Sequence, residues 1–231
     1  MKNFLAPIFP QAGASEKRTS KAESEVPKKD RLEFSTSNQY WEERYLRGRN
    51  SGAGSYGRLA DFKAEVLNDF VARNFIHSVI EFGSGDGSQL SLAKYPEYLG
   101  VDVSQTAVDA CRGKFSRDTT KTFVNSADFS DRKADLTLSL DVIYHLVEDD
   151  VFANYMETLF DASSRFVIIY SSNKDEIHTQ KHVRHRCFTD WVAAHRPEFR
   201  NIEHIPNRYP FDQEDPNNTS FADFYIFERI S

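Results

Sequence analysis

The chain has 231 residues, of which 39% are hydrophobic and 19 are phenylalanine, so it can bury the core of one sizeable α/β domain. Its net charge of −6 argues against broad binding of polyanions, because nucleic-acid-binding domains usually carry a basic surface. The two cysteines form neither a disulfide framework nor a zinc pattern, and no apolar run approaches the roughly 20 residues that span a bilayer. These features predict a soluble protein of the reducing cytoplasm.

The first 31 residues predict a tail that precedes the folded domain. Residues 1–10 are apolar but contain prolines and are too short for the core of a secretory signal. They fit a frayed terminus better than a docking peptide. Residues 11–31 are mostly Ser, Lys, Glu and Ala, which bury too little apolar surface to offset the entropy of ordering. We therefore predict a disordered tail over residues 1–31 and a single domain over residues 32–231.

Residues 38–46 predict a short amphipathic helix, and the glycine-rich stretch 51–58 that follows it predicts a loop. The pair is consistent with a lid over a site, or with a helix at the sheet edge followed by a flexible linker. Beyond it, apolar residues recur at i, i+4, i+5, i+8 and i+9 from Phe62 to Val71. This spacing indicates a helix with one face toward the core.

The stretch 79–87, with the sequence VIEFGSGDG, joins an apolar strand to a glycine-rich turn. Glycine lets the backbone turn tightly and approach a ligand closely, because it lacks a Cβ and tolerates positive φ. The spacing is G-x-G-x-G, whereas the dinucleotide fingerprint G-x-G-x-x-G needs its third small residue at Ser88. Glu81 and Asp86 flank the turn, and their carboxylates favour a cationic ligand over a pyrophosphate. Residues 88–93 then have the apolar spacing of a helix.

Strands and helices alternate along the rest of the chain. Predicted strands cover residues 98–102, 121–124, 134–140, 166–170, 201–205 and 221–227. Predicted helices cover residues 105–112, 149–161 and 190–195, the last with Thr189 as its N-cap. The alternation predicts a doubly wound parallel sheet with helices on both faces.

Four motifs, in this order and at this spacing, resemble those of class I S-adenosylmethionine-dependent methyltransferases. Besides the glycine-rich turn, the segment 98–102 ends a second strand in an acid, and the segment 126–129 follows a third. The segment 141–146 is similar to the D-V-x-x-H-L stretch of small-molecule members. The resemblance implies a Rossmann-like, seven-stranded, mostly parallel sheet with an antiparallel last strand beside the fifth. It also implies S-adenosyl-L-methionine as the cofactor.

The resemblance further implies where the cofactor binds. Glu81, the glycine turn and Asp141 hold the methionine end, and Arg58 from the lid meets the methionine carboxylate. The complete implied set is Arg58, Glu81, Gly83, Gly85, Asp86, Gly87, Asp102, Val103, Asp128, Phe129 and Asp141.

At the other end of the cofactor, the resemblance assigns the ribose to Asp102, with Val103 beside it, and the adenine to Asp128 and Phe129. Asp102 is otherwise a turn former after a strand, but that interpretation leaves its spacing from the glycine turn unexplained. Asp128 is otherwise a loop cap.

His145 is the candidate general base, because an imidazole just past the fourth strand can take the proton of a methyl acceptor. Tyr144 is a second catalytic candidate. Methyl transfer to oxygen or nitrogen is an in-line displacement that depends mainly on positioning, so one base suffices. A structural role at the start of a helix or loop is the alternative for His145.

Residues 174–186 carry four Lys or Arg and three His against Asp175 and Glu176. One interpretation is an anion clamp in which Arg184, His185 and Arg186 bind an acidic substrate. The other is a solvated loop. No metal is expected here, because the histidines lack supporting carboxylates and a zinc pattern.

These observations predict a methyltransferase that acts on an oxygen or nitrogen atom of a small, acidic metabolite or biosynthetic intermediate, with no membrane partner. A nucleic-acid methyltransferase is disfavoured by the net charge and by SLDV where the amino-methylating members have N/D-P-P-Y/F. A protein methyltransferase and a non-catalytic S-adenosylmethionine-binding module remain as alternatives.

Overall fold

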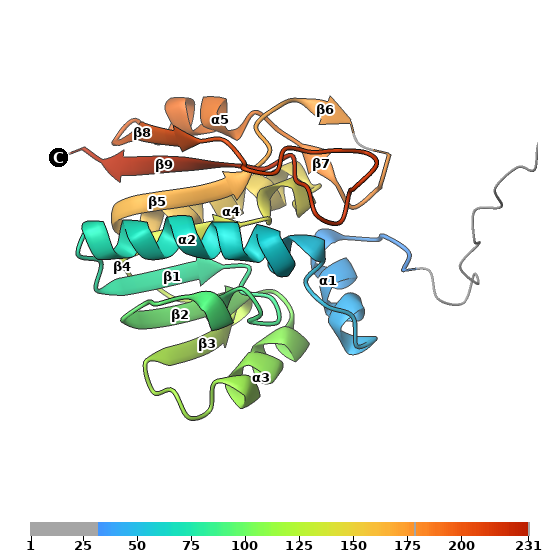
Figure 1. Cartoon of the computed structure of the whole chain (residues 1–231), viewed down its shortest axis with the longest axis horizontal. Coiled ribbons are helices and arrows are strands. Elements are labelled where there is room, and N and C mark those ends of the chain that lie inside the picture. The colour runs from blue at the N-terminus through green and yellow to red at the C-terminus, as the bar shows by residue number, and fades with distance from the viewer. Residues whose placement is uncertain (1–31, 178, 231) are drawn as a thin grey trace, which may run out of the picture. The chain divides into compact units, whose positions relative to one another are not determined.

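A computed structural model describes residues 32–177 and 179–230, so the predicted tail over residues 1–31 and His178 lie outside the described part. A central sheet runs through the described part, with helices on both sides (Figure 1). Its strands are β1 (Ser78–Phe82), β2 (Glu97–Asp102), β3 (Lys121–Asn125), β4 (Ala134–Leu140), β5 (Ser163–Ser171), β8 (Phe199–Ile205) and β9 (Asp223–Arg229).

The strand order is β3-β2-β1-β4-β5-β9-β8, in which β1 to β5 are parallel and β9 runs antiparallel to both β5 and β8. The expected seven-stranded sheet with an antiparallel last strand is therefore confirmed. The chain leaves β1 toward β2 and β3, and later returns to lay β4 on the other side of β1. Such a reversal opens a crevice at the carboxyl ends of β1 and β4.

Helices cover both faces of this sheet. They are α1 (Ser37–Leu46), α2 (Gly57–Arg73), α3 (Gln105–Lys114), α4 (Asp149–Asp161) and α5 (Phe188–His195), with short turns η2 (Ala53–Ser55), η3 (Leu90–Leu92), η4 (Ser126–Asp128) and η5 (Ile143–His145). Apolar residues of α2 and α3 pack in the core on one face, and those of α4 and α5 pack on the other. None of the helices in the described ranges is long and apolar enough to cross a membrane.

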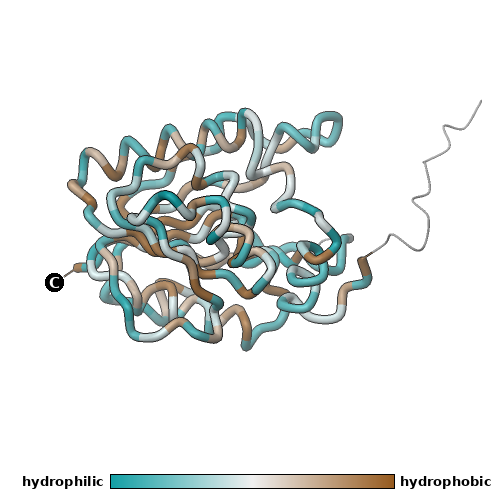
Figure 2. Tube along the Cα trace, turned by 90° about the horizontal axis from the view of Figure 1, so that it is seen from below, coloured by the Kyte–Doolittle hydropathy of each residue, from teal (hydrophilic) through white to brown (hydrophobic). Residues whose placement is uncertain are grey.

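The core follows the two-residue period of a strand buried on both faces. In β5, Phe166 and Ile168 pack on the side of α2, whereas Val167 and Ile169 pack on the side of α4. Figure 2 shows hydrophobic segments mostly in the middle of the described part and hydrophilic ones mostly outside.

The helix predicted after the glycine turn is wrong, because residues 88–93 contain only the three-residue turn η3 (Leu90–Leu92). Pro96 disfavours a helical conformation at Tyr95, and β2 begins at Glu97, so the connection is too short for a full helix. The crevice beside this turn is covered by α1 and the loop that follows it.

The cap of the last helix also differs from the prediction. α5 begins at Phe188, so Thr189 lies inside the helix and its hydroxyl bonds to Asn173 instead. The basic stretch 174–186, predicted as a loop, contains the short antiparallel pair β6 (Glu176–Ile177) and β7 (Arg184–His185).

Candidate active site

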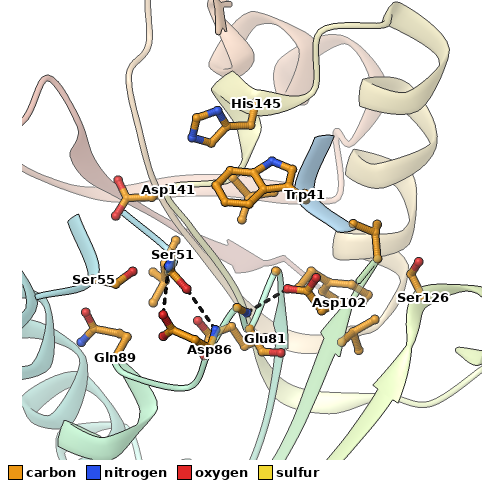
Figure 3. A pocket seen from close by; sticks show the side chains of 18 of the residues that line it. Trp41, Ser51, Ser55, Glu81, Asp86, Gln89, Asp102, Ser126, Asp141 and His145 are labelled. Carbon is orange, nitrogen blue, oxygen red and sulfur yellow. Dashed lines mark hydrogen bonds between the residues drawn. The ribbon is translucent and has the colours of Figure 1, made fainter. Parts of the chain in front are cut away.

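A cavity opens at the carboxyl ends of β1, β2 and β4, beneath α1 and the loop that follows it (Figure 3). Its empty space is about 900 Å³ when the open solvent at its mouth is included. The predicted site residues that line it are Glu81, Gly83, Gly85, Asp86, Asp102, Val103, Asp141 and His145. Most of the predicted cofactor set is thus brought together in one place.

The glycine turn must be glycine because the lid and β4 approach its backbone. Gly83 has a φ of 86°, and a Cβ there would lie 2.3 Å from Val142 Cγ2. Gly85 has a φ of 56°, and a Cβ there would lie 2.4 Å from Ser51 Oγ. Gly87 packs away from the cavity, where a Cβ would meet the Phe115 ring at 2.7 Å. The first two glycines therefore shape the floor, and the third supports the turn.

Asp102 is held at the end of β2 by the backbone. Its Oδ2 accepts a hydrogen bond from Gly85 N at 2.8 Å, and its Oδ1 accepts one from Ser104 N at 2.9 Å. Its side chain is almost fully buried, and this burial raises the pKa of its carboxyl to about 6. The aspartate links the glycine turn to β2 and presents its carboxylate to the cavity.

Asp86 ties the lid loop to the glycine turn. Its Oδ2 accepts hydrogen bonds from Ser51 N at 2.9 Å and Tyr56 OH at 2.6 Å, and Ser51 Oγ accepts one from Asp86 N at 3.0 Å. Tyr45 of α1 bonds to the same Ser51 hydroxyl at 3.0 Å. The loop predicted either as a lid or as a linker is therefore bonded to the glycine turn through Asp86.

Helix α1 is fastened on two further sides. At its N-terminus, Ser37 Oγ donates to Glu148 Oε2 at 2.5 Å and Ser37 N donates to Glu148 Oε1 at 3.0 Å. In its middle, Glu42 Oε1 accepts a hydrogen bond from Thr106 Oγ1 of α3 at 2.7 Å. The helix thus bridges the loops that follow β2 and β4.

A buried ion pair lies at the β1–β4 end of the cavity. Lys63 of α2 is 1% exposed and donates from Nζ to Asp141 Oδ2 at 2.7 Å. Asp141 has a φ of 60° and accepts a second hydrogen bond from Tyr144 OH at 2.8 Å. Burial of Tyr144 beside this carboxylate raises the pKa of the phenol well above its usual value, so Tyr144 acts as a hydrogen-bond donor.

Glu81 lies on β1, close enough to Lys63 to interact with its charge. Its Oε2 accepts a hydrogen bond from Tyr98 OH at 2.8 Å. Burial raises the pKa of Glu81 to about 7, although Tyr98 and the charge of Lys63 act in the opposite direction. Among the described lining residues, the charged set is therefore four carboxylates and one lysine: Glu81, Asp86, Asp102, Asp141 and Lys63.

Arg58 does not line this cavity. Its Nε donates to Asn218 O at 2.6 Å, its guanidinium pairs with Asp215 at 3.2 Å, and it stacks over the Tyr209 ring. The arginine therefore fastens the 206–220 segment to α2, and among the described lining residues of the cavity the cation is Lys63. Lys63 lies on the core-facing side of α2, one turn before Leu67 and two turns before Phe70. This position is the sequence signal that identifies such a buried lysine.

The predicted adenine residues lie at the rim. Asp128 is exposed and does not line the cavity, whereas Ser126 of the same turn does. Phe129 packs edge-on against Phe82 with a centroid distance of 5.1 Å. Phe129 does not line the cavity itself, but its ring packs on Phe82, which does.

His145 lines the cavity opposite the glycine turn. Its Nδ1 lies 3.0 Å from the carbonyl oxygen of His182, which can only accept, so Nδ1 carries the hydrogen. Nε2 then has the lone pair that can take a proton. The ring packs against Trp41 at 4.9 Å, and burial lowers the pKa of His145 to about 4, which keeps the imidazole neutral at physiological pH.

The residues of the predicted anion clamp do not line the cavity, and Arg184 and Arg186 bond to the junction of η5 and α4. Both guanidiniums pair with Asp149 Oδ1 at 2.9 Å, and both donate to the carbonyl oxygen of Val147. Arg186 also donates to Leu146 O and stacks on Phe152. His185 is buried, with its Nδ1 2.6 Å from Ser172 Oγ.

Arg186 is therefore expected to stabilise the fold. Arg186→Leu should lower the free energy of unfolding by about 1–3 kcal/mol, because the buried Leu146 carbonyl oxygen loses its side-chain donor and the Val147 carbonyl oxygen keeps only Arg184. Arg184→Leu should cost less, since that side chain is 43% exposed. Urea unfolding of both variants measures the difference. A fully stable Arg186→Leu protein with weakened acceptor binding would restore the clamp.

Comparisons with known proteins agree with this geometry. Residues 80–168 match the family model described as a methyltransferase domain. No curated protein sequence matches the chain.

Similar solved structures share the fold at low sequence identity. The N-methyltransferase NodS from Bradyrhizobium japonicum WM9, in complex with S-adenosyl-L-homocysteine, is 13% identical with a TM-score of 0.68, over 85% of this chain and 100% of that one. Magnesium protoporphyrin IX methyltransferase from Synechocystis PCC 6803 is 15% identical with a TM-score of 0.60, over 83% and 97%. The methyltransferase domain of bacterial CtHen1-C is 18% identical with a TM-score of 0.57, over 73% and 97%.

Proposed function

We propose, from the premise that this chain is a class I S-adenosylmethionine-dependent methyltransferase, that it methylates an oxygen or nitrogen atom of a small-molecule acceptor. The observation that carries the proposal is His145, a neutral imidazole with an assigned tautomer on the wall of a lidded cavity. Three contacts hold α1 and its loop over this cavity. Because the cavity is covered in this way, it favours a small acceptor over a polymer.

The cofactor-binding residues lie along the sheet in the order of the parts that they would hold. Ser126 and Val103 line the cavity beyond β2 and β3, where they would flank the adenosine part, and Asp102 would accept hydrogen bonds from the ribose hydroxyls. At the β1–β4 end of the cavity, Lys63 would hold the carboxylate of the methionine part and Asp141 its ammonium group. Arg58, first expected in this role, is replaced by Lys63.

When bound, S-adenosylmethionine supplies an electrophilic methyl group on a positively charged sulfur. The acceptor lone pair forms the new bond to carbon while the carbon–sulfur bond breaks, and the sulfur keeps that electron pair. Nε2 of His145 takes the proton that the acceptor loses. The protein contributes by aligning the two reactants and excluding water under the lid.

The acceptor is uncharged or cationic. The acidic acceptor expected from the basic stretch depended on Arg184 and Arg186, and both pair with Asp149 outside the cavity. Lys63 offsets the charge of Asp141, and burial raises the pKa of Glu81 to about 7. Asp86 and Asp102 therefore leave the described lining with a negative charge that disfavours an anion and, for the same reason, a phosphate backbone. RNA is thus the less favoured acceptor, although a Hen1 methyltransferase domain shares the fold.

A transfer experiment tests the proposal. The purified protein is incubated with methyl-labelled cofactor and separate pools of phenols, amines, carboxylic acids, RNA and protein. Label in the phenol or amine pool is the expected result. Label in RNA or protein alone would contradict a small-molecule acceptor, and binding without transfer to any pool would favour a non-catalytic module.

Asp102 gives a prediction for cofactor affinity. Asp102→Ala should weaken S-adenosylhomocysteine binding by about 1–3 kcal/mol, because charge-assisted hydrogen bonds to the ribose are lost. Calorimetry measures this loss, with the exposed Asp109→Ala as the matched control. Since burial raises the pKa of Asp102 to about 6, wild-type affinity should fall as the pH drops through 6 and the carboxylate becomes protonated. An unchanged dissociation constant in folded Asp102→Ala would assign the residue to the turn alone.

A further inference from the structure

Three side chains on one face of α1 contact His145 or its neighbour His182. Ser37, Tyr40 and Trp41 stand at i, i+3 and i+4, the spacing that places side chains on one helix face. The Ser37 hydroxyl hydrogen is shared between Glu148 Oε2 and the His145 carbonyl oxygen, which lies 2.8 Å from Ser37 Oγ, and the Trp41 ring meets the imidazole edge-on at 4.9 Å. Tyr40 instead stacks on His182, with a centroid distance of 4.5 Å and an interplanar angle of 15°.

His182 is the residue that orients His145. Its carbonyl oxygen accepts the hydrogen bond from Nδ1 at 3.0 Å, and its ring lies parallel to the His145 ring at 5.6 Å and 11°. Tyr40, His182 and His145 therefore form one stack of nearly parallel rings. The stack begins on the lid and ends on the base.

The position of His182 depends on this stack. The residue lies between β6 and β7, whose pairing covers only two residues on each strand. Within the same turn, Val183 N donates to Gln180 O at 3.0 Å. A hairpin this short restrains its connecting segment less than the main sheet restrains β4. The packing of Tyr40 on the His182 ring therefore helps to hold the His182 carbonyl oxygen within hydrogen-bond distance of His145 Nδ1.

We propose that Tyr40 is a positioning residue, which holds His145 in its reactive tautomer through His182 while α1 covers the cavity. The inference rests on the proposed role of His145 as the base. Lifting α1 removes Ser37, Tyr40 and Trp41 from the His145 region together, so the base is assembled only under a closed lid. Proton transfer is thereby confined to the state in which water is excluded.

Nuclear magnetic resonance of imidazole ¹⁵N in the full chain, with S-adenosylhomocysteine bound, tests the proposal without an acceptor. The wild-type His145 ring should carry its hydrogen on Nδ1 and titrate near its lowered pKa of about 4. Tyr40→Phe keeps the ring and should leave both properties unchanged. Tyr40→Ala should give a mixture of tautomers and a pKa that rises toward the usual value of about 6.5.

The other titratable and charged groups that face His145 are Asp141, Arg44 and Tyr144, which are the same in all three proteins and do not contact Tyr40 in the stack. His182 is also present in all three, and the proposal predicts that its position changes when the Tyr40 ring is lost. Tyr40→Leu, which keeps an apolar side chain, replaces Tyr40→Ala if the alanine variant fails to fold.

Two outcomes would overturn the assignment. One is a wild-type tautomer and pKa in the variants that lack the ring. The other is a loss of S-adenosylhomocysteine affinity as large as any change at His145, which would make Tyr40 part of the cofactor lid only. Once an acceptor is known, kcat of the ring-deleted variant should fall about tenfold, because a displaced base keeps part of its usual effect. If His145 is not the base, kcat of the variant without the Tyr40 ring should stay unchanged, while its His145 tautomer should still differ from the wild type. The two proposals therefore fail in different measurements.

Discussion

His145→Ala is expected to lower kcat about 10²-fold or more, as for loss of a general base, while the affinity for S-adenosylhomocysteine stays near that of the wild type. The ring lines the cavity, and its Nδ1 hydrogen is committed to the His182 carbonyl oxygen. Only Nε2 is left to take a proton. Single-turnover kinetics with labelled cofactor, together with calorimetry, separates the two effects.

The pH profile adds a second test of His145. Because burial lowers the pKa of the folded protein's imidazole to about 4, the neutral, active form is lost only as the pH falls through 4. The pH profile of turnover should therefore show no loss from protonation of His145 between pH 8 and pH 6. Tyr144→Phe is the matched control, since the Tyr144 hydroxyl donates to Asp141 and is no base at neutral pH. A kinetic pKa near 6.5, or equal losses in stability and turnover for His145→Ala, would contradict the assignment.

Lys63→Met is expected to weaken S-adenosylhomocysteine binding by about 1–3 kcal/mol, the loss for a charge-assisted contact with the methionine carboxylate. The same variant should bind 5′-methylthioadenosine, which has no amino-acid end, as the wild type does. Calorimetry with both ligands gives the comparison. Arg58→Ala should change neither affinity, because that guanidinium is bound to Asp215 and Asn218.

Loss of Lys63 also leaves Asp141 without its partner, and removing one member of a buried pair commonly costs about 3–5 kcal/mol of stability. The double variant Lys63→Met with Asp141→Asn removes the uncompensated carboxylate. Binding of 5′-methylthioadenosine then reports whether the site is folded. Equal losses for the two ligands would show that Lys63 acts on the fold and not on the amino-acid end.

Much of the fold was determined by local patterns in the sequence. The bounds of β4 and α4 agree with the predicted residues, because continuous apolar runs and helical periodicity are set by neighbours along the chain. Gly83 and Gly85 were predictable for a similar reason, since a tight turn with positive φ requires glycine wherever the chain lies. Asp102, at the end of a buried strand, was likewise placed in the cavity by its position in the sequence.

Only the tertiary structure decided which charged groups meet. Arg184 and Arg186 are concentrated in a basic stretch, yet both bind Asp149, which is more than thirty residues away in the sequence. Lys63 is close to Asp141 across 78 residues, and Tyr40 reaches His145 only through a residue of the β6–β7 segment. A charge pairs with whatever lies within a few ångströms of it, and for such partners that distance is created by packing of the sheet, not by spacing along the chain.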